Sequence, residues 1–289
     1  MTSFDDRSAR SGANEGSGGQ SPGAKSLYRR LSDSLFDPMP ITTGPWRPDA
    51  QHGGPPSALL AHLCEQAVDD GETTARIRVE LLTGIPLEPL ESTVERRPVS
   101  RRVAHVEAEL RQGSRPVARA TALVLATGDM PEPAWRLERP NHPDWRQTES
   151  RTAPHWAAGP DEPVFHRDGL EHRFVVGAFD AAGPATDWVR LRYPVVDDVE
   201  TTGVQQIMAS VDVGSGISAV FDPSEGFGLI NADLDVAFVA PAHGDWLLLD
   251  AVTHPGPDGT GLAVTRVYDE VGLVAVATQC LLGTAFNPG

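Results

Sequence analysis

The sequence predicts an α+β fold in which antiparallel strands wrap a buried helix, and it predicts that this unit occurs twice. Three observations support the prediction. A turn of glycine and proline opens an apolar helical segment at residues 52–66, runs of alternating polar and apolar residues follow it, and a second helix and strand set follows the first. Alternation with a period of two is typical of half-buried strands, whereas apolar residues three and four apart indicate a helix.

Residues 1–26 are rich in glycine, serine and charge, and we expect them to form a disordered tail. An N-terminal unit is expected over residues 27–128. Its helix begins at Pro55 and Pro56, which fit a first turn because no backbone N–H is needed there. Leucines then recur at helical spacing, and the helix should end near Asp69, Asp70 and Gly71.

After this helix the pattern changes to strands with one polar face, which predicts an antiparallel meander. The strands are expected at residues 75–81, 92–96, 104–110 and 117–123. Residues 129–169 are dense in proline and tryptophan without a sustained period. They are therefore interpreted as a connection laid over the surface.

The C-terminal unit is expected over residues 170–289, with a second helix within residues 202–221. Its strands are expected at residues 174–179, 188–193, 230–239, 246–252, 261–268 and 273–282. Landmarks of the two units correspond in order. Ile85-Pro86 matches Ala240-Pro241, and Gln112-Gly113 matches Val271-Gly272, which indicates a degenerate internal duplication.

The chain has 289 residues, 40% of them hydrophobic, and a net charge of −16. That length can bury a sizeable core, and the acidic balance disfavours nucleic acid and anionic membranes as partners. No apolar run is long enough to span a bilayer, so we expect a soluble, cytoplasmic protein. Cys64 and Cys280 both lie in apolar runs, which suits reduced core residues; no metal and no cofactor are expected.

Several segments together resemble the TesB-like acyl-CoA thioesterase family, and more closely its actinobacterial-type thioesterase-like branch. They are His52 to Pro56, Ser210 to Ser218, Ile230 to Pro241, and Gln279 in the last strand. The resemblance implies a double hotdog, in which two antiparallel sheets each wrap around a long central helix. It also implies hydrolysis of acyl-CoA to free fatty acid and coenzyme A.

The resemblance implies a catalytic set of Asp233, Thr253 and Gln279, which would hold a water molecule and activate it by general-base catalysis. The matching positions of the first unit hold residues that cannot replace them, so we expect one site per chain. Each residue also has a structural interpretation: Asp233 as a strand-end carboxylate, Gln279 as a satisfied core amide, and Thr253 as an ordinary strand residue.

The start of the first helix is the expected place for the thioester oxygen. The backbone N–H groups of Gly53 and Gly54 lie at the positive end of that helix, and glycine permits close approach. His52 is expected to orient this turn. His52 could instead perform the acid–base chemistry of a hotdog hydratase, although the sequence shows no motif for the carboxylate that such a histidine usually needs.

The densest positive cluster in the chain consists of Arg96, Arg97, Arg101 and Arg102. It could receive the phosphates of coenzyme A, or it could be the solvated surface of a hairpin. The sequence leaves open whether the acyl carrier is coenzyme A or a carrier protein, and whether the protein hydrolyses its ligand or only binds acyl chains. By resemblance we expect a homodimer.

Overall fold

A computed structural model of the chain describes residues 25–131, 135, 139–153, 162–197, 199–222 and 226–285. The predicted tail falls almost entirely on residues 1–24, which lie outside the described residues. Order in the described part begins with Ser26, which is buried, and with Leu27, whose backbone N–H donates to Pro194 O at 2.8 Å.

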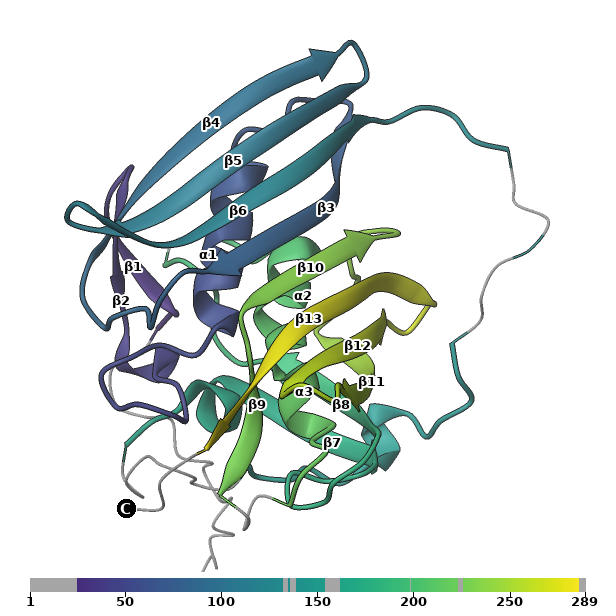
Figure 1. Cartoon of the computed structure of the whole chain (residues 1–289). Helices are drawn as coiled ribbons and strands as arrows, with labels where there is room; N and C mark the ends of the chain where they lie inside the picture. The colour runs from purple at the N-terminus through teal and green to yellow at the C-terminus, as the bar shows by residue number, and fades with distance from the viewer. Residues whose placement is uncertain are drawn as a thin grey trace, which may run out of the picture.

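The strands in the described part of the chain form one antiparallel sheet of thirteen members (Figure 1). Those of the first half are β1 (Tyr28–Ser32), β2 (Leu35–Pro38), β3 (Glu72–Leu81), β4 (Leu90–Ser100), β5 (Val103–Gln112) and β6 (Arg115–Ala126). Those of the second half are β7 (Leu170–Val176), β8 (Ala185–Leu191), β9 (Phe227–Asn231), β10 (Asp233–Phe238), β11 (Trp246–Pro255), β12 (Thr260–Tyr268) and β13 (Leu273–Ala285). The order across the sheet is β1-β2-β4-β5-β6-β3-β10-β13-β12-β11-β8-β7, with β9 paired to β13.

The two halves join where β3 pairs with β10, and this seam corrects the expectation of two separate sheets. Val79 pairs with Leu234 at its centre. The flanking pairs are Arg78 with Asp235 and Glu80 with Asp233. Val79 and Leu234 each stand 7 residues before the matched prolines, Pro86 and Pro241, so the seam pairs equivalent positions of the two predicted copies.

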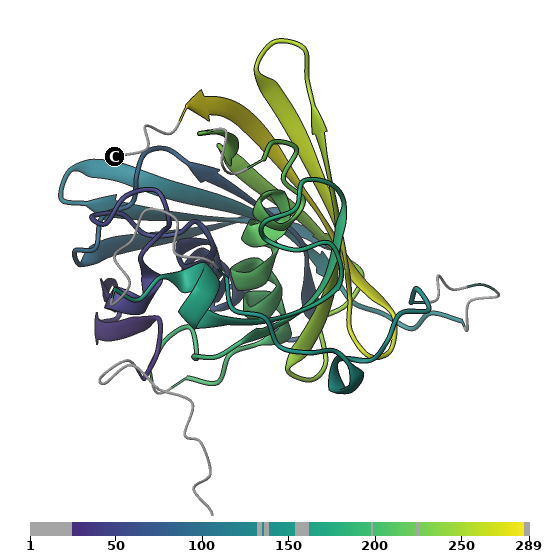
Figure 2. The ribbon, with the colours of Figure 1, turned by 90° about the horizontal axis from the view of Figure 1, so that it is seen from below.

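Two helical segments lie on the same side of the sheet, as Figures 1 and 2 show. The first is α1 (Gly54–Glu65), and the second runs through α2 (Gly203–Ser210), the 3-10 turn η4 (Val211–Val213) and α3 (Gly214–Ile217). The predicted long central helices are therefore wrong in length: α1 ends at Glu65, well before Gly71, and the second segment changes helix type after Ser210. Shorter helical turns are η1 (Pro40–Thr42), η2 (Trp145–Gln147) and the π-helical turn η3 (Phe165–Gly169).

The helices α1 and α2 pack closely because Gly54 has no side chain. A Cβ on Gly54 would lie 2.4 Å from Ala209 O. Nearly every residue of α1 is buried, and its leucines and alanines share one core with the inward side chains of both half-sheets. The glycine that opens the helix thus brings the start of α1 against the end of α2.

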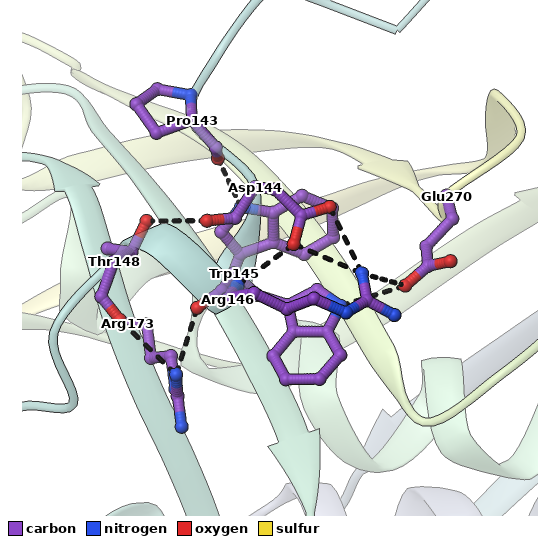
Figure 3. Close-up of polar contacts among 8 residues, drawn as sticks. Pro143, Asp144, Trp145, Arg146, Thr148, Arg173 and Glu270 are labelled. Carbon is purple, nitrogen blue, oxygen red and sulfur yellow. Dashed lines mark hydrogen bonds and ion pairs between the residues drawn. The ribbon is translucent and has the colours of Figure 1, made fainter.

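The described part of the connection is held against the outer face of the second half-sheet (Figure 3). The ring of Trp145 stacks on Trp246 with centroids 5.0 Å apart, and its Nε1 donates to Glu270 at 2.8 Å. Arg173 donates to the carbonyls of Trp145 and Thr148. The predicted connection does not lie wholly on the surface, because η3, at its end, lies beside the site described below.

Cys64 is buried in α1 as expected, whereas Cys280 is exposed and corrects the expectation of two core cysteines. Cys280 lies on β13 between the buried Gln279 and Leu281, and successive side chains of a strand point to opposite faces. Within the described residues, no helix combines the length and the apolar character needed to cross a bilayer.

We predict that His62 makes the fold sensitive to mild acid. Burial of the ring, aided by the Arg30 guanidinium 3.1 Å away, lowers the pKa of His62 to about 4. Between pH 6.5 and 4 the unfolded chain binds a proton that the folded chain does not, so stability should fall as the pH falls through this window. The histidine's share of that loss is about 2–3 kcal/mol at its lower end.

Urea unfolding of wild type and His62→Gln between pH 4 and 7.5 checks this prediction. Glu65 acts in the opposite direction, because burial raises the pKa of its carboxyl. The difference between the two proteins therefore isolates the histidine. Parallel pH profiles for wild type and variant would contradict the assignment.

Candidate active site

A cavity of about 1240 Å³ opens between the loop before α1, strand β9 and the helical segment after α2. Its wall is mostly apolar and includes Phe179, Ile217, Phe221, Phe227 and Leu229. The polar residues along it include His52, Asp212, Asn231 and Thr253. A cavity of this size and character suits an apolar chain that carries one reactive polar group.

A close polar contact beside this cavity joins His52 and Asp212. Nδ1 of His52 lies 2.7 Å from Oδ2 of Asp212, and the two side chains are 10% and 3% exposed. The backbone N–H of Gly54 lies farther from the same nitrogen, at 3.2 Å. The shorter contact favours a proton on Nδ1 that is donated to the carboxylate, which leaves the lone pair of Nε2 to accept.

Two further features hold the carboxylate of Asp212 in place. Asn231 donates from Nδ2 to Oδ1 at 2.6 Å. A Cβ on Gly53 would lie 2.8 Å from both carboxylate oxygens, so only glycine allows Asp212 to approach the start of α1 this closely. Both oxygens of Asp212 are therefore used, one by His52 and the other by Asn231.

Gln279 and Thr253, two of the residues predicted from the resemblance, both bind the segment that carries Asp212. Gln279 is 1% exposed; its Nε2 donates to Asp212 O at 3.1 Å, and its Oε1 accepts from Ser215 N at 3.1 Å. The hydroxyls of Thr253 and Ser218 lie 2.7 Å apart, and Ser218 donates to Gly214 O. Gln279 thus has the contacts of a satisfied core amide that fixes the backbone around Asp212.

Asp233, the predicted base, lies away from this group and is absent from the cavity wall. Its Oδ1 accepts from Cys280 N at 2.8 Å, and Arg78 lies 3.8 Å from its other oxygen. Asp233 follows the break between β9 and β10, where the ladder with β13 is interrupted. The carboxylate replaces a missing backbone acceptor at this break, so the geometry gives Asp233 a structural role.

This placement predicts different outcomes for two substitutions of Asp233. Asp233→Asn keeps an oxygen for Cys280 N and should leave stability and activity close to wild type. Asp233→Ala removes the acceptor and should cost about 1–2 kcal/mol of unfolding free energy. Denaturant unfolding and thiol-release assays check both variants. A large loss of activity in folded Asp233→Asn would restore Asp233 to the catalytic set.

His52, Gly53 and Gly54 lie together at the start of α1, with His52 and Gly53 on the cavity wall. The arginine cluster does not lie there. Arg96 donates to Ala67 O at 2.8 Å and to Glu72 at 2.9 Å, beyond the C-terminal end of α1 and thus at the other end of the helix. Arg97 is paired with Glu95 and Glu107. Arg101 and Arg102 lie in the turn between β4 and β5. These positions and contacts favour the interpretation of the cluster as hairpin surface.

The π-helical turn η3 adds two residues to the site that the sequence did not indicate. The rings of Phe165 and His166 lie 5.3 and 6.0 Å from that of His52, and His166 lines the cavity. His172 supports this turn, because its Nε2 lies 2.8 Å from His166 O. Its Nδ1 lies 2.6 Å from Asp187 Oδ2, and both side chains are almost fully buried.

Asp212 is the residue that sequence reasoning missed, although it stands in a segment that carried the family resemblance. The sequence shows an aspartate in a glycine-containing turn, and only the fold brings it to His52. The described residues contain no group of three or more His, Cys, Asp or Glu that could hold a metal ion. The arrangement can activate water next to an apolar cavity, which is the chemistry of a hydrolase acting on a lipid-like acyl group.

Comparisons with known proteins agree with this class. The family model for the acyl-CoA thioesterase N-terminal domain matches residues 42–125, and the model for the C-terminal domain matches residues 141–282. The chain belongs to the TesB-like acyl-CoA thioesterase family and is an acyl-CoA thioester hydrolase. A search of curated protein sequences finds no match.

Solved structures show the same fold at low sequence identity. A conserved protein of unknown function with a hot dog fold from Alicyclobacillus acidocaldarius has a TM-score of 0.70 and 15% identity, covering 89% of this chain and 95% of that one. The tesB protein of Mycobacterium avium subsp. paratuberculosis has a TM-score of 0.63 and 15% identity over 89% and 96% of the chains. Acyl-CoA thioesterase II TesB2 from Mycobacterium marinum has a TM-score of 0.57 and 16% identity over 91% and 96%.

Proposed function

We propose that this thioesterase hydrolyses acyl-CoA with a water molecule activated by His52, and that Asp212 is the carboxylate of the site. The observation that carries the proposal is the 2.7 Å contact between the largely buried His52 and the buried Asp212, beside a mostly apolar cavity of about 1240 Å³. A histidine with a proton on Nδ1 can accept another at Nε2, and the adjacent carboxylate stabilises the imidazolium that forms.

In the proposed reaction, Nε2 of His52 removes a proton from water as the water oxygen attacks the thioester carbonyl. The carbonyl oxygen becomes an oxyanion next to the N–H groups of Gly53 and Gly54 at the positive end of α1. Collapse of the tetrahedral intermediate breaks the carbon–sulfur bond. The thiolate of coenzyme A takes the proton from His52, and the carboxylic acid is released.

The residues expected from the resemblance take positioning roles in this scheme. Gln279 holds the backbone at Asp212 and Ser215, and Thr253 holds Ser218 three residues further along the segment. The role of general base expected of Asp233 passes to the His52–Asp212 pair. Asn231 joins the site because it fixes the second oxygen of Asp212.

The pairing of His52 with a carboxylate also bears on the hydratase alternative, for which the sequence showed no partner. Asp212 supplies one, so the pair alone does not separate hydration from hydrolysis. The match of both halves of the chain to acyl-CoA thioesterase domains favours hydrolysis. A non-hydrolytic acyl-binding role is disfavoured on the same ground.

The test is release of free thiol from a panel of short, medium and long acyl-CoAs, read alongside the absorbance of an enoyl-CoA. If the protein is a hydrolase, at least one acyl-CoA of the panel should release thiol. The absorbance of the enoyl-CoA should not fall before its thioester is cleaved. Loss of enoyl absorbance without thiol release would identify a hydratase. Binding of the panel without either signal would identify an acyl-binding protein.

We further propose the finer features that the resemblance implies. The continuous sheet with two helical segments supports a double hotdog with one copy per half of the chain. We propose that it acts as a homodimer in the cytoplasm, on acyl-CoAs of fatty acid metabolism. Light scattering tests the dimer, and a strictly monomeric mass in solution would exclude it.

A further inference from the structure

The loop that leads to His52 carries a basic side chain at the cavity. Among the described residues that line the cavity, Arg47 is the only arginine or lysine. It stands beside a mostly apolar wall in a chain with a net charge of −16. An anionic part of the substrate would be drawn to this point of the rim.

Backbone contacts fix the position of this loop relative to His52. Thr43 and Gln51 form an antiparallel bridge, and Gly44 N donates to Ala50 O at 2.9 Å. The stem therefore closes immediately before the histidine, and the tip holds Trp46 and Arg47. Four residues lie between Arg47 and His52, and the five steps from one Cα to the next span at most about 18 Å.

The present contacts of Arg47 leave it able to bind an anion. Its side chain is 62% exposed, and it pairs with Asp49 through Nε at 2.9 Å and Nη2 at 2.6 Å. An exposed ion pair of this kind contributes little stability. A diphosphate carries more charge than one carboxylate and accepts bidentate hydrogen bonds from guanidinium, so it competes well for Arg47.

The neighbouring Trp46 offers a second recognition element. It lines the cavity and is 48% exposed, which is high for so large an apolar side chain. An aromatic face beside a guanidinium suits a nucleotide, because the base can stack while the phosphates bind the charge. The cavity thus has an apolar wall, the His52–Asp212 pair and this tip, which suit in turn the acyl chain, the thioester and the nucleotide of an acyl-CoA.

We infer that Trp46 and Arg47 bind the nucleotide diphosphate end of coenzyme A and so select coenzyme A thioesters over acyl-pantetheines. The inference rests on the proposed function, since it assumes that the thioester lies at His52. It also replaces the arginine cluster at the opposite end of α1, which the sequence alone suggested for the phosphates.

Arg47→Gln tests the inference with two substrates of the same acyl chain, an acyl-CoA and the acyl-pantetheine that lacks the nucleotide. We expect the ratio of kcat/KM for acyl-CoA to that for acyl-pantetheine to fall about tenfold, mainly through KM, as expected for loss of a charge-assisted hydrogen bond. Asp49→Asn frees Arg47 and should raise the ratio. Arg101→Gln, from the rejected cluster, is the matched control and should keep the wild-type ratio.

An equal effect of Arg47→Gln on both substrates overturns the inference. So does a fall in the ratio in Arg101→Gln that matches the fall in Arg47→Gln. An acyl-phosphopantetheine carries a single phosphate and no nucleotide. If Arg47→Gln lowers kcat/KM for this substrate, relative to acyl-pantetheine, as much as it does for acyl-CoA, the nucleotide assignment is overturned. If the wild type hydrolyses neither thioester, the proposed function fails. Calorimetry with free coenzyme A then tests the subsite by itself. Equal affinities of wild type and Arg47→Gln for coenzyme A overturn the subsite.

Discussion

Replacement of Asp212 by Asn, or of His52 by Gln, is expected to lower kcat/KM for acyl-CoA by about 10²–10⁴-fold. Asparagine keeps the shape of Asp212 beside Gly53, but it cannot stabilise a protonated His52. Glutamine at position 52 cannot take a proton from water. Steady-state release of free thiol from the best acyl-CoA of the panel measures both losses.

The two substitutions act on one unit, so their effects should not add. The double variant is expected to be about as slow as the slower single variant. Thermal unfolding of each variant controls for loss of fold, and Asp233→Asn provides a carboxylate-to-amide control outside the cavity. A fully active Asp212→Asn, or additive losses in the double variant, would contradict the proposed pair.

The strands and the start of α1 could be predicted because their signals are local. Alternation along residues 104–110 and 117–123 places every second side chain on the helix side, and the structure confirms β5 and β6 there. Pro55 and Pro56 mark the first turn of α1 as expected. Joining of the two half-sheets had no such signal, because the pairing of Val79 with Leu234 links residues far apart in the sequence.

The proposed carboxylate, Asp212, differs from the one expected from the sequence, Asp233, for a similar reason. Asp233 and Asp212 both stand in segments that carry the family resemblance, and nothing in the sequence tells which one faces the cavity. The answer depends on the change from α2 to a 3-10 turn after Ser210 and on the break between β9 and β10. The first turns Asp212 toward His52, and the second uses Asp233 to satisfy Cys280 N.

Charge density alone did not locate the basic residue beside the cavity. Four arginines close together in sequence left a phosphate site and a hairpin surface open, and the structure places Arg96 beyond the C-terminal end of α1, where it donates to Ala67 O. A single arginine on a loop, Arg47, lies at the cavity instead. The position of a charge relative to the reacting atoms depends on tertiary structure, which local composition does not encode.

Asp187→Ala is expected to have the largest effect on stability, because it breaks the buried His172–Asp187 pair, which supports the turn η3 beside the active site. Both nitrogens of His172 face oxygens, Asp187 Oδ2 at 2.6 Å and His166 O at 2.8 Å. Burial raises the pKa of Asp187, against the lowering effect of His172. Asp187 also accepts from Arg173 N at 2.9 Å.

Removal of this carboxylate leaves Nδ1 of the buried His172 and the N–H of Arg173 without a partner, at a cost of about 3–5 kcal/mol of unfolding free energy. Since His172 holds the turn that places Phe165 and His166 beside His52, the folded variant should also lose activity. Urea unfolding gives the first quantity and thiol release, corrected for the folded fraction, the second. Asp187→Asn keeps an acceptor for Arg173 and should lose less of both; a cost below about 1 kcal/mol for Asp187→Ala would show that the pair does not hold the turn.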